Sequence, residues 1–445
     1  MPSPSSSPSA PLSNRSQIFV WTLFDFANTS FSVLIVAVGY TLYFKEIVVG
    51  GAGRGDFFWG LAVSISMFLT AIIAPVLGAA SDFAHNRKRF LFLFTIVSVV
   101  CTGLLYFVEA GMVLTGMTLF IIANVGFEGG IVFYNAFLPS LTEPRFFGKI
   151  SGYGFAMGYV GSLVSLLIAI PLFAGGFEQD NLFNVRLSFV LAAAMFLLFS
   201  LPLFLFLRDS SSKQATTSSY IRSGFQRVKN TIAHLRSYKN IARFLLAFFI
   251  YNDGILTVIA FASIFAQQSL QFSLQEILIL FAVVQASAII GSLLFGYLTD
   301  AIGPKKTIVI TLLCWIAVVT GAYFVTSKEL FFFIGVVAGG SMGGSQSASR
   351  TLMALLTPPE REAEFFGFYD GLCGKASAVI GTFLFGALSW MTGSQRLAVA
   401  TIGLFFFVGL WLLSYVEDPF VKQRLTHKGV TPGDPAAHTS LAGAE

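Results

Sequence analysis

The chain has 445 residues, of which 55% are apolar and 11% are charged, with a formal net charge of +5. Soluble proteins carry about 25% charged residues, so this composition excludes an ordinary soluble globular protein and indicates an integral membrane protein. The three cysteines have neither zinc nor disulfide spacing, and we expect no metal and no cofactor.

The first 17 residues are rich in Pro and Ser and lack the basic segment that begins a signal peptide, so we expect a disordered tail. A membrane-spanning helix needs about 20 mostly apolar residues. Twelve windows of this kind follow, at residues 18–44, 57–80, 90–109, 112–138, 150–174, 186–207, 241–266, 274–298, 307–326, 330–355, 364–391 and 396–416. The sequence therefore predicts an all-α integral membrane fold with twelve transmembrane helices.

The connections between these spans are short except for residues 208–240. This linker divides the chain into two predicted six-helix bundles, residues 18–207 and 241–416, followed by a polar C-terminal tail at residues 417–445. Within the linker, apolar residues spaced by three and four share one helix face among several Lys and Arg. They are Ile221, Phe225, Val228, Ile232 and Leu235. The pattern fits a helix on the anionic inner leaflet and fits a solvated linker helix equally well.

Lys and Arg near the span ends are concentrated on one side of the predicted membrane topology. That side carries Arg87, Lys88, Arg89, Arg145, Lys149, Lys305, Lys306, Arg361 and the basic linker. Cytoplasmic loops of membrane proteins carry this excess. We therefore expect both termini and the linker to be cytoplasmic, in a multi-pass protein of the cell (inner) membrane.

The two halves share short motifs at nearly constant spacing. GAASDFAHNRK begins at Gly78 and GYLTDAIGPKK at Gly296, 218 residues later. FFGKISG at Phe146 and FFGFYDG at Phe365 are 219 residues apart. Internal duplication in a membrane protein indicates alternating access between two bundles.

Twelve spans with G-x-x-x-D and basic residues after the second and the eighth resemble the major facilitator superfamily. Three stretches resemble its vacuole-effluxer-like branch, the autophagy-related amino-acid effluxers and their bacterial relatives. They are DFANTSF at Asp25, YNDGILTVI at Tyr251 and GGSQSASRTLMALLTPPEREAEFFGFYDGLCGKASAVIG from Gly343. The resemblance implies that spans 1, 4, 7 and 10 line a cavity, that spans 2, 5, 8 and 11 form the seam, and that spans 3, 6, 9 and 12 face lipid. It also favours a monomer.

Polar and charged residues that are costly to bury lie inside the four spans expected to line the cavity, and Asp370 and Lys375 lie in span 11. A charge at mid-bilayer costs roughly 3 kcal/mol, so such groups persist where they face water or a partner. The candidates for substrate binding or proton coupling are Asp25, Asn28, Glu128, Asn252, Asp253, Gln346 and Lys375. At about 1.5 Å per residue, three of these carboxylates reach a similar depth. Three neighbouring carboxylates repel one another when all are ionised, so we expect one of them to exchange a proton with its surroundings. The alternative is that they only hydrogen-bond neighbouring helices.

Lys375 is open to two interpretations, since it can neutralise a carboxylate of another span or bind a substrate carboxylate. It follows Asp370 by five residues, so an α-helix would not place both on one stripe.

A gate is expected at the cytoplasmic ends. The resemblance implies that Arg350, near that end of span 10, pairs with Asp300 or Glu364; binding of a substrate anion is the alternative. Asp82 with Arg87 or Lys88 would form the matching contact in the first half. The complete predicted gate is Asp82, Arg87, Lys88, Asp300, Lys305, Arg350 and Glu364.

The predicted function is secondary active transport of a small polar solute, such as an amino acid, by alternating access. A proton gradient is the expected driving force, since the chain has no nucleotide-binding P-loop motif. No nucleophile–base arrangement indicates an enzyme. Expected partners are the solute, protons and membrane lipid, without nucleic acid. The alternatives are an uncoupled facilitator of a neutral solute such as a sugar, or a transporter-like receptor without turnover.

Overall fold

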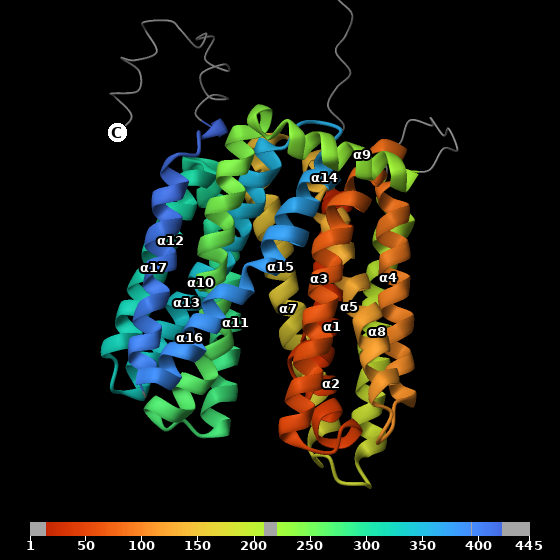
Figure 1. Cartoon of the computed structure of the whole chain (residues 1–445), viewed down its shortest axis with the longest axis vertical. Coiled ribbons are helices and arrows are strands. Elements are labelled where there is room, and N and C mark those ends of the chain that lie inside the picture. The colour runs from red at the N-terminus through yellow and green to blue at the C-terminus, as the bar shows by residue number, and fades with distance from the viewer. Residues whose placement is uncertain (1–14, 209–219, 393, 421–445) are drawn as a thin grey trace, which may run out of the picture.

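The computed structural model describes residues 15–208, 220–392 and 394–420, and every regular element in these ranges is helical. The predicted all-α class is confirmed. Most of both predicted tails lies outside the described residues, although the first helix already begins at Arg15. Helices that precede and follow the linker form two groups side by side, here called the first and second group (Figure 1).

The first group contains the six spans of residues 15–206, some of them built from several helical segments. Its segments are α1 (Arg15–Phe31), η1 (Ser32–Ala37), α2 (Gly39–Tyr43), η2 (Phe44–Val48), α3 (Ala52–Ala84), α4 (Arg87–Leu104), η3 (Leu105–Phe107), α5 (Val113–Asn135), α6 (Leu138–Leu141), η4 (Pro144–Phe146), α7 (Phe147–Phe173) and α8 (Leu182–Phe206).

The second group contains the remaining six spans, whose segments are η5 (Leu235–Tyr238), α10 (Lys239–Leu270), α11 (Leu274–Ile302), α12 (Pro304–Phe324), α13 (Lys328–Leu356), α14 (Glu362–Phe366), η6 (Gly367–Cys373), α15 (Gly374–Ala376), α16 (Ala378–Thr392) and α17 (Gln395–Ser414). The segments η1, η2 and η6 are π-helical, and η3, η4 and η5 are 3₁₀-helical.

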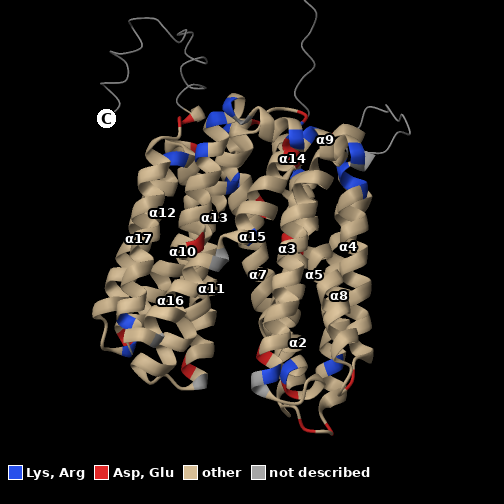
Figure 2. Cartoon of the chain, in the orientation of Figure 1, with Lys and Arg blue, Asp and Glu red and all other residues tan. Residues whose placement is uncertain are grey.

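Eleven of the helices in the described residues are long and apolar enough to cross a membrane. The tenth span, α13, has 29 residues but is rich in Gly and Ser, which lowers its hydropathy. It packs against α7, α10, α11 and α12. Surrounding protein therefore replaces much of the lipid contact that would demand apolar side chains. Charged residues gather at the two ends of the helices, with few in between (Figure 2).

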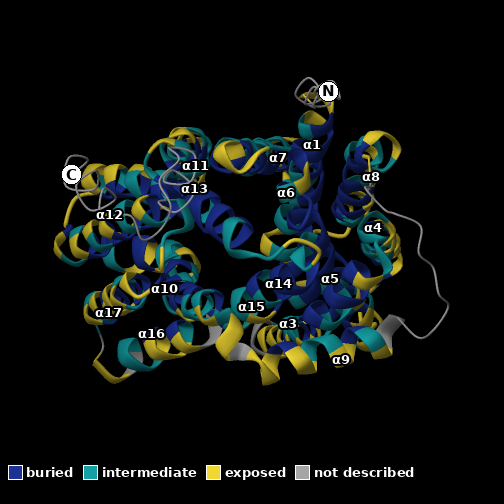
Figure 3. Ribbon diagram, turned by 90° about the horizontal axis from the view of Figure 1, so that it is seen from above, coloured by how far each residue is buried: buried dark blue, intermediate teal, exposed yellow. Residues whose placement is uncertain are grey.

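Helix α9 (Tyr220–Ala233) lies in the linker, across one end of the molecule and along the edge beside α3 (Figure 3). We call this end the α9 end and the opposite one the distal end. Gly224 faces the α3 backbone, because a Cβ there would lie 2.5 Å from the carbonyl oxygen of Val76. Thr231 is buried, whereas Phe225 and Ile232 are 62% and 57% exposed. The predicted apolar face is therefore turned outward, and small residues hold α9 against the bundle.

The two groups meet at the α9 end and diverge toward the distal end (Figure 1). Their contacts use glycines that allow backbone to approach backbone. A Cβ on Gly296 would lie 2.9 Å from the carbonyl oxygen of Gly148, and a Cβ on Gly367 would lie 2.6 Å from the Cα of Pro75. These are the Gly residues of the repeated motifs, so the duplication places small residues on both sides of the seam.

Candidate functional site

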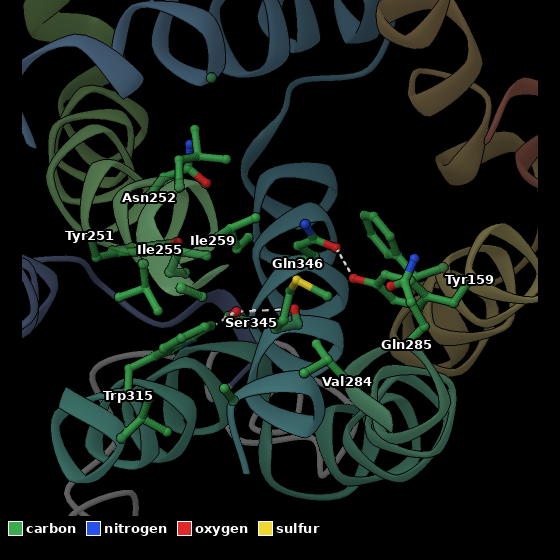
Figure 4. Close-up of a pocket in the computed structure, with 18 of the residues that line it drawn as sticks. Tyr159, Tyr251, Asn252, Ile255, Ile259, Val284, Gln285, Trp315, Ser345 and Gln346 are labelled. Carbon is green, nitrogen blue, oxygen red and sulfur yellow. Dashed lines mark hydrogen bonds between the residues drawn. The ribbon is translucent and has the colours of Figure 1, made fainter. Parts of the chain in front are cut away.

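A cavity of about 560 Å³ lies between the two groups. Polar side chains from α7, α10, α11 and α13 line it, together with aromatic and aliphatic ones (Figure 4). Asp25 and Asn28 of α1 line it as well. Spans 1, 4, 7 and 10 contribute as the resemblance implies. Spans 9 and 12, expected to face lipid, also reach it through Trp315, Val318 and Val399. Both spans also expose large apolar side chains, such as Phe324 and Trp411, on the outer surface as expected. They reach the cavity in addition, because in the second group the cavity extends between helices toward the distal end.

Arg350 of α13 lies at one wall of the cavity and is only 1% exposed. Its Nε donates to Ser151 Oγ at 2.9 Å, its Nη2 to the Ser151 carbonyl at 2.7 Å, and its Nη1 to Asn135 Oδ1 at 2.9 Å. The Nη1 atom also lies 3.5 Å from a carboxylate oxygen of Asp25. All these partners belong to the first group, so the contacts form only while the two groups are closed at this level.

Aromatic rings enclose the same guanidinium. Its carbon lies 4.1 Å from the centroid of Phe155 and 5.0 Å from that of Trp21. The hydroxyl of Tyr134 donates to Asp25 Oδ2 at 2.6 Å. Asp25 and its neighbour Asn28 both line the cavity, in accordance with their predicted position.

A second set of cross-group contacts comes from span 11. Lys375 Nζ forms an ion pair with Glu128 of α5 at 2.5 Å, which agrees with the interpretation that it neutralises a carboxylate of another span. Asn135 Nδ2 donates to Asp370 Oδ2 at 2.8 Å. Asp370 and Lys375 both line the cavity, although an α-helix would separate them. Asp370 lies in the π-helical η6, whose i→i+5 turns bring residues five apart to one side.

Two amides also line the cavity. Gln346 Oε1 accepts a hydrogen bond from Tyr159 at 2.5 Å, which links α13 to α7 across the groups (Figure 4). Asn252 Nδ2 donates to Ser377 Oγ at 2.8 Å, within the second group. Their carbonyl and amide groups can bind a polar part of a solute.

Asp253 does not line the cavity in the structure, although the sequence places it in the predicted coupling set. Its side chain is 0% exposed, and both carboxylate oxygens lie 2.9 Å from the backbone nitrogen of Gly381. Gly381 is in the first turn of α16, where backbone N–H groups have no partner within the helix. Asp253 therefore caps a helix of its own group, and the prediction of a cavity position is wrong.

The α9 end is closed by two related caps. Asp82, in the last turn of α3, accepts the N–H groups of Ala363 and Glu364 at 3.2 and 2.9 Å. Asp300, in the last turn of α11, accepts those of Gly148 and Lys149 at 2.8 and 3.0 Å. Each carboxylate thus caps the first turn of a helix in the opposite group, where a negative charge is favoured.

The remaining gate candidates take different partners. Arg87 binds Asp82 at 2.8 Å, as predicted, and also pairs with Glu362 of the second group. Lys88 donates to the carbonyl of Leu207, and Lys305 to those of Ser414 and Val416, so both contact their own group.

Glu364 anchors the linker helix. It accepts from Thr231 of α9 at 2.5 Å and pairs with Arg227 of α9 at 3.1 Å. The predicted pairing of Arg350 with Asp300 or Glu364 is wrong, because Arg350 lies deeper and its partners are on α1, α5 and α7.

The described residues contain no group of three or more His, Cys, Asp and Glu side chains that could hold a metal ion. The site therefore offers charge pairs, amides and rings for recognition of a solute.

Several site residues were not singled out from the sequence. Tyr134 donates to Asp25, Ser151 accepts from Arg350, and Tyr159 donates to the amide of Gln346. In an apolar helix such residues resemble ordinary membrane aromatics and small packing residues. Only their pairing with charges on other helices identifies them.

Two helix groups around a cavity that is closed at one end define a membrane transporter of the major facilitator fold. The fold is similar to that of the proton:xylose symporter XylE bound to 6-bromo-6-deoxy-D-glucose. The TM-score is 0.73 and the identity 15%, covering 91% of this chain and 96% of that one.

The family model described as "Vacuole effluxer Atg22 like" matches residues 57–147 and 145–420, and the chain belongs to this family. It is 28% identical to the uncharacterized MFS-type transporter YxiO of Bacillus subtilis over 405 residues, which cover 89% of this chain and 94% of the relative. It is 24% identical to autophagy-related protein 22 of Kluyveromyces lactis over 383 residues, covering 79% and 77%. The predicted family is thereby confirmed.

Proposed function

We propose that the protein is a proton-coupled secondary transporter that moves small solutes with a charged or polar head and an apolar body, such as amino acids, by alternating access. The observation that carries this proposal is the composition of the cavity. Charged and amide side chains line the cavity together with many rings and aliphatic side chains.

These polar side chains suit a zwitterion. Lys375 supplies a cation for a carboxylate, and Asp25, which lines the same cavity, supplies a carboxylate for an ammonium group. Gln346 and Asn252 can bind either end through hydrogen bonds. Phe248 and Trp315 offer apolar surface for the solute body. The family's description as effluxers supports a transport role.

We place the α9 end in the cytoplasm of a cell (inner) membrane, because basic residues of the linker and loops gather there. In that orientation the structure corresponds to an outward-facing state. Opening of the α9 end would then release the caps at Asp82 and Asp300 and the contacts of Arg350. One monomer holds the whole cavity.

The test is solute exchange in liposomes that contain the purified protein and a pH-sensitive dye. Labelled amino acids, peptides and sugars are offered singly, with protein-free liposomes and Gln346→Ala as controls. Counterflow of an amino acid is expected, together with a change in dye signal during its net uptake into empty liposomes. Counterflow of a sugar without a dye signal would replace the proposal by uncoupled facilitation. Saturable binding without flux would indicate a receptor.

A further inference from the structure

The layer where the two groups meet holds an odd number of charges. Asp25 pairs with Arg350, and Glu128 pairs with Lys375. Asp370 is the third carboxylate in this layer, and it accepts a hydrogen bond from the neutral amide of Asn135. With all five groups ionised, the layer would carry one uncompensated negative charge.

Within the described part of the chain, no cation forms an ion pair with Asp370 itself. Arg350 of α13 and Lys375 of α15 are near enough to interact with it electrostatically, as is the like charge of Glu128 on α5. Both cations are nevertheless in closer contact with other carboxylates.

Among the residues that the structure describes, the other elements packed against η6 contribute no compensating charge at this level. From α14, Glu362 and Glu364 are acidic and pair with Arg87 and Arg227. From α3, the backbone and side chains of Thr70, Ala74 and Pro75 face Gly367 and Gly371. From α10, Phe248 and Tyr251 lie near Tyr369. Keeping an unpaired carboxylate charged in such a place costs more than protonating it.

We infer that Asp370 is the proton-carrying group of the transport cycle and holds its proton while the α9 end is closed. This inference rests on the proposed function and goes beyond it by assigning the coupling step to one residue. Asp370 lines the cavity, so its proton can come from water that enters at the distal end.

Asn135 ties the proton to the conformational change. Its amide nitrogen donates to Asp370 in the second group, and its oxygen accepts from Arg350 of the same group. When the groups separate at the α9 end, Asn135 leaves with the first group, and Asp370 faces water on that side. A neutral acid can lose the Asn135 contact without exposing a charge, whereas a carboxylate needs water or a solute ammonium to replace it.

Infrared spectroscopy tests the protonation directly and needs no solute. The C=O stretch of a protonated carboxylic acid is recorded at pH 7 for purified protein, for Asp370→Asn and for the control Glu360→Gln, whose carboxylate is exposed and lies outside this layer. We expect Asp370→Asn to lose one acid band that the control retains. An unchanged band in Asp370→Asn overturns the inference, whatever solute the protein moves.

Transport provides the second readout. Asp370→Asn is expected to keep counterflow of the labelled solute but to lose accumulation driven by a proton gradient, down to the passive level. Proton-driven accumulation at the wild-type level in Asp370→Asn overturns the inference. Absence of counterflow in the wild type would instead refute the proposed function. The infrared result would still show whether Asp370 is protonated.

A third variant covers the case that Asp370→Asn does not fold. Asp370→Glu keeps the acid but moves it by one methylene group. We expect it to retain an acid band at a shifted frequency and proton-driven accumulation with a shifted pH profile. Loss of the band in a folded Asp370→Glu would overturn the assignment.

Discussion

Arg350→Ala offers a sharp test of how the closed α9 end is held. The guanidinium is 1% exposed, donates three hydrogen bonds and lies 3.5 Å from a carboxylate oxygen of Asp25. Removal of one partner of a buried ion pair costs about 3–5 kcal/mol. Every one of these partners belongs to the first group. The substitution therefore destabilises the conformation that is closed at the α9 end and does not affect the conformation in which the groups are separated there.

The magnitude follows from that asymmetry. About 1.4 kcal/mol changes an equilibrium tenfold, so a loss of about 3 kcal/mol shifts the ratio of the two conformations roughly 100-fold toward opening at the α9 end. Spin labels at Arg145 and Lys306, which are exposed on opposite groups at this end, report the change. The three native cysteines are replaced first. We expect a longer distance to become populated in Arg350→Ala.

The matched control is Arg243→Ala. Arg243 contacts the carbonyl of Tyr415 and the carboxylate of Glu417, all within the second group. Its loss should leave the distance distribution unchanged. An equal distribution in Arg350→Ala and wild type would refute the view that Arg350 holds the groups together.

Three further predictions follow from individual contacts. Gly148→Ala should lower the melting temperature by the equivalent of about 1–3 kcal/mol, because its Cβ would lie 2.6 Å from Asp300 Oδ1, whereas Gly386→Ala, with no atom within 4 Å, should not. Asp253→Asn should lower thermal stability by about 1–3 kcal/mol yet leave proton-coupled accumulation intact, and loss of coupling would restore Asp253 to the coupling set. Glu364→Gln should weaken the attachment of α9 by about 1.4 kcal/mol, so that amide hydrogen exchange in residues 222–233 becomes roughly tenfold faster. The exposed Glu360→Gln is the control, and equal exchange rates in the two variants would contradict the anchoring role of Glu364.

Most of the helix positions could be predicted from local composition. Lipid leaves a backbone no hydrogen-bond partner outside its own helix, so each crossing must be one apolar segment of about 20 residues. Even α13, whose Gly and Ser content lowers its hydropathy, was predicted as an apolar window at residues 330–355. The internal repeat also indicated two equivalent helix ends, at Asp82 and Asp300. Both prove to be capping residues across the seam.

The partners of the buried charges could not be predicted in the same way. Arg350 binds Asn135, 215 positions away. Because Arg350 lies away from the helix ends, it pairs with Asp25 and not with the carboxylates at those ends. Asp253 is one residue from Asn252, yet the two face different surroundings because consecutive helical residues point about 100° apart. The π-helical turn that brings Asp370 and Lys375 together shows no distinctive local pattern.

The sequence by itself thus determined which segments cross the membrane and which helices carry charge, since lipid acts on each segment separately. The tertiary structure decided which charges pair, which carboxylate caps a helix and which one is left without a cation. Those outcomes depend on how two helix groups dock, because a buried charge is stabilised only by atoms within a few ångströms of it, and here those atoms come from distant parts of the chain.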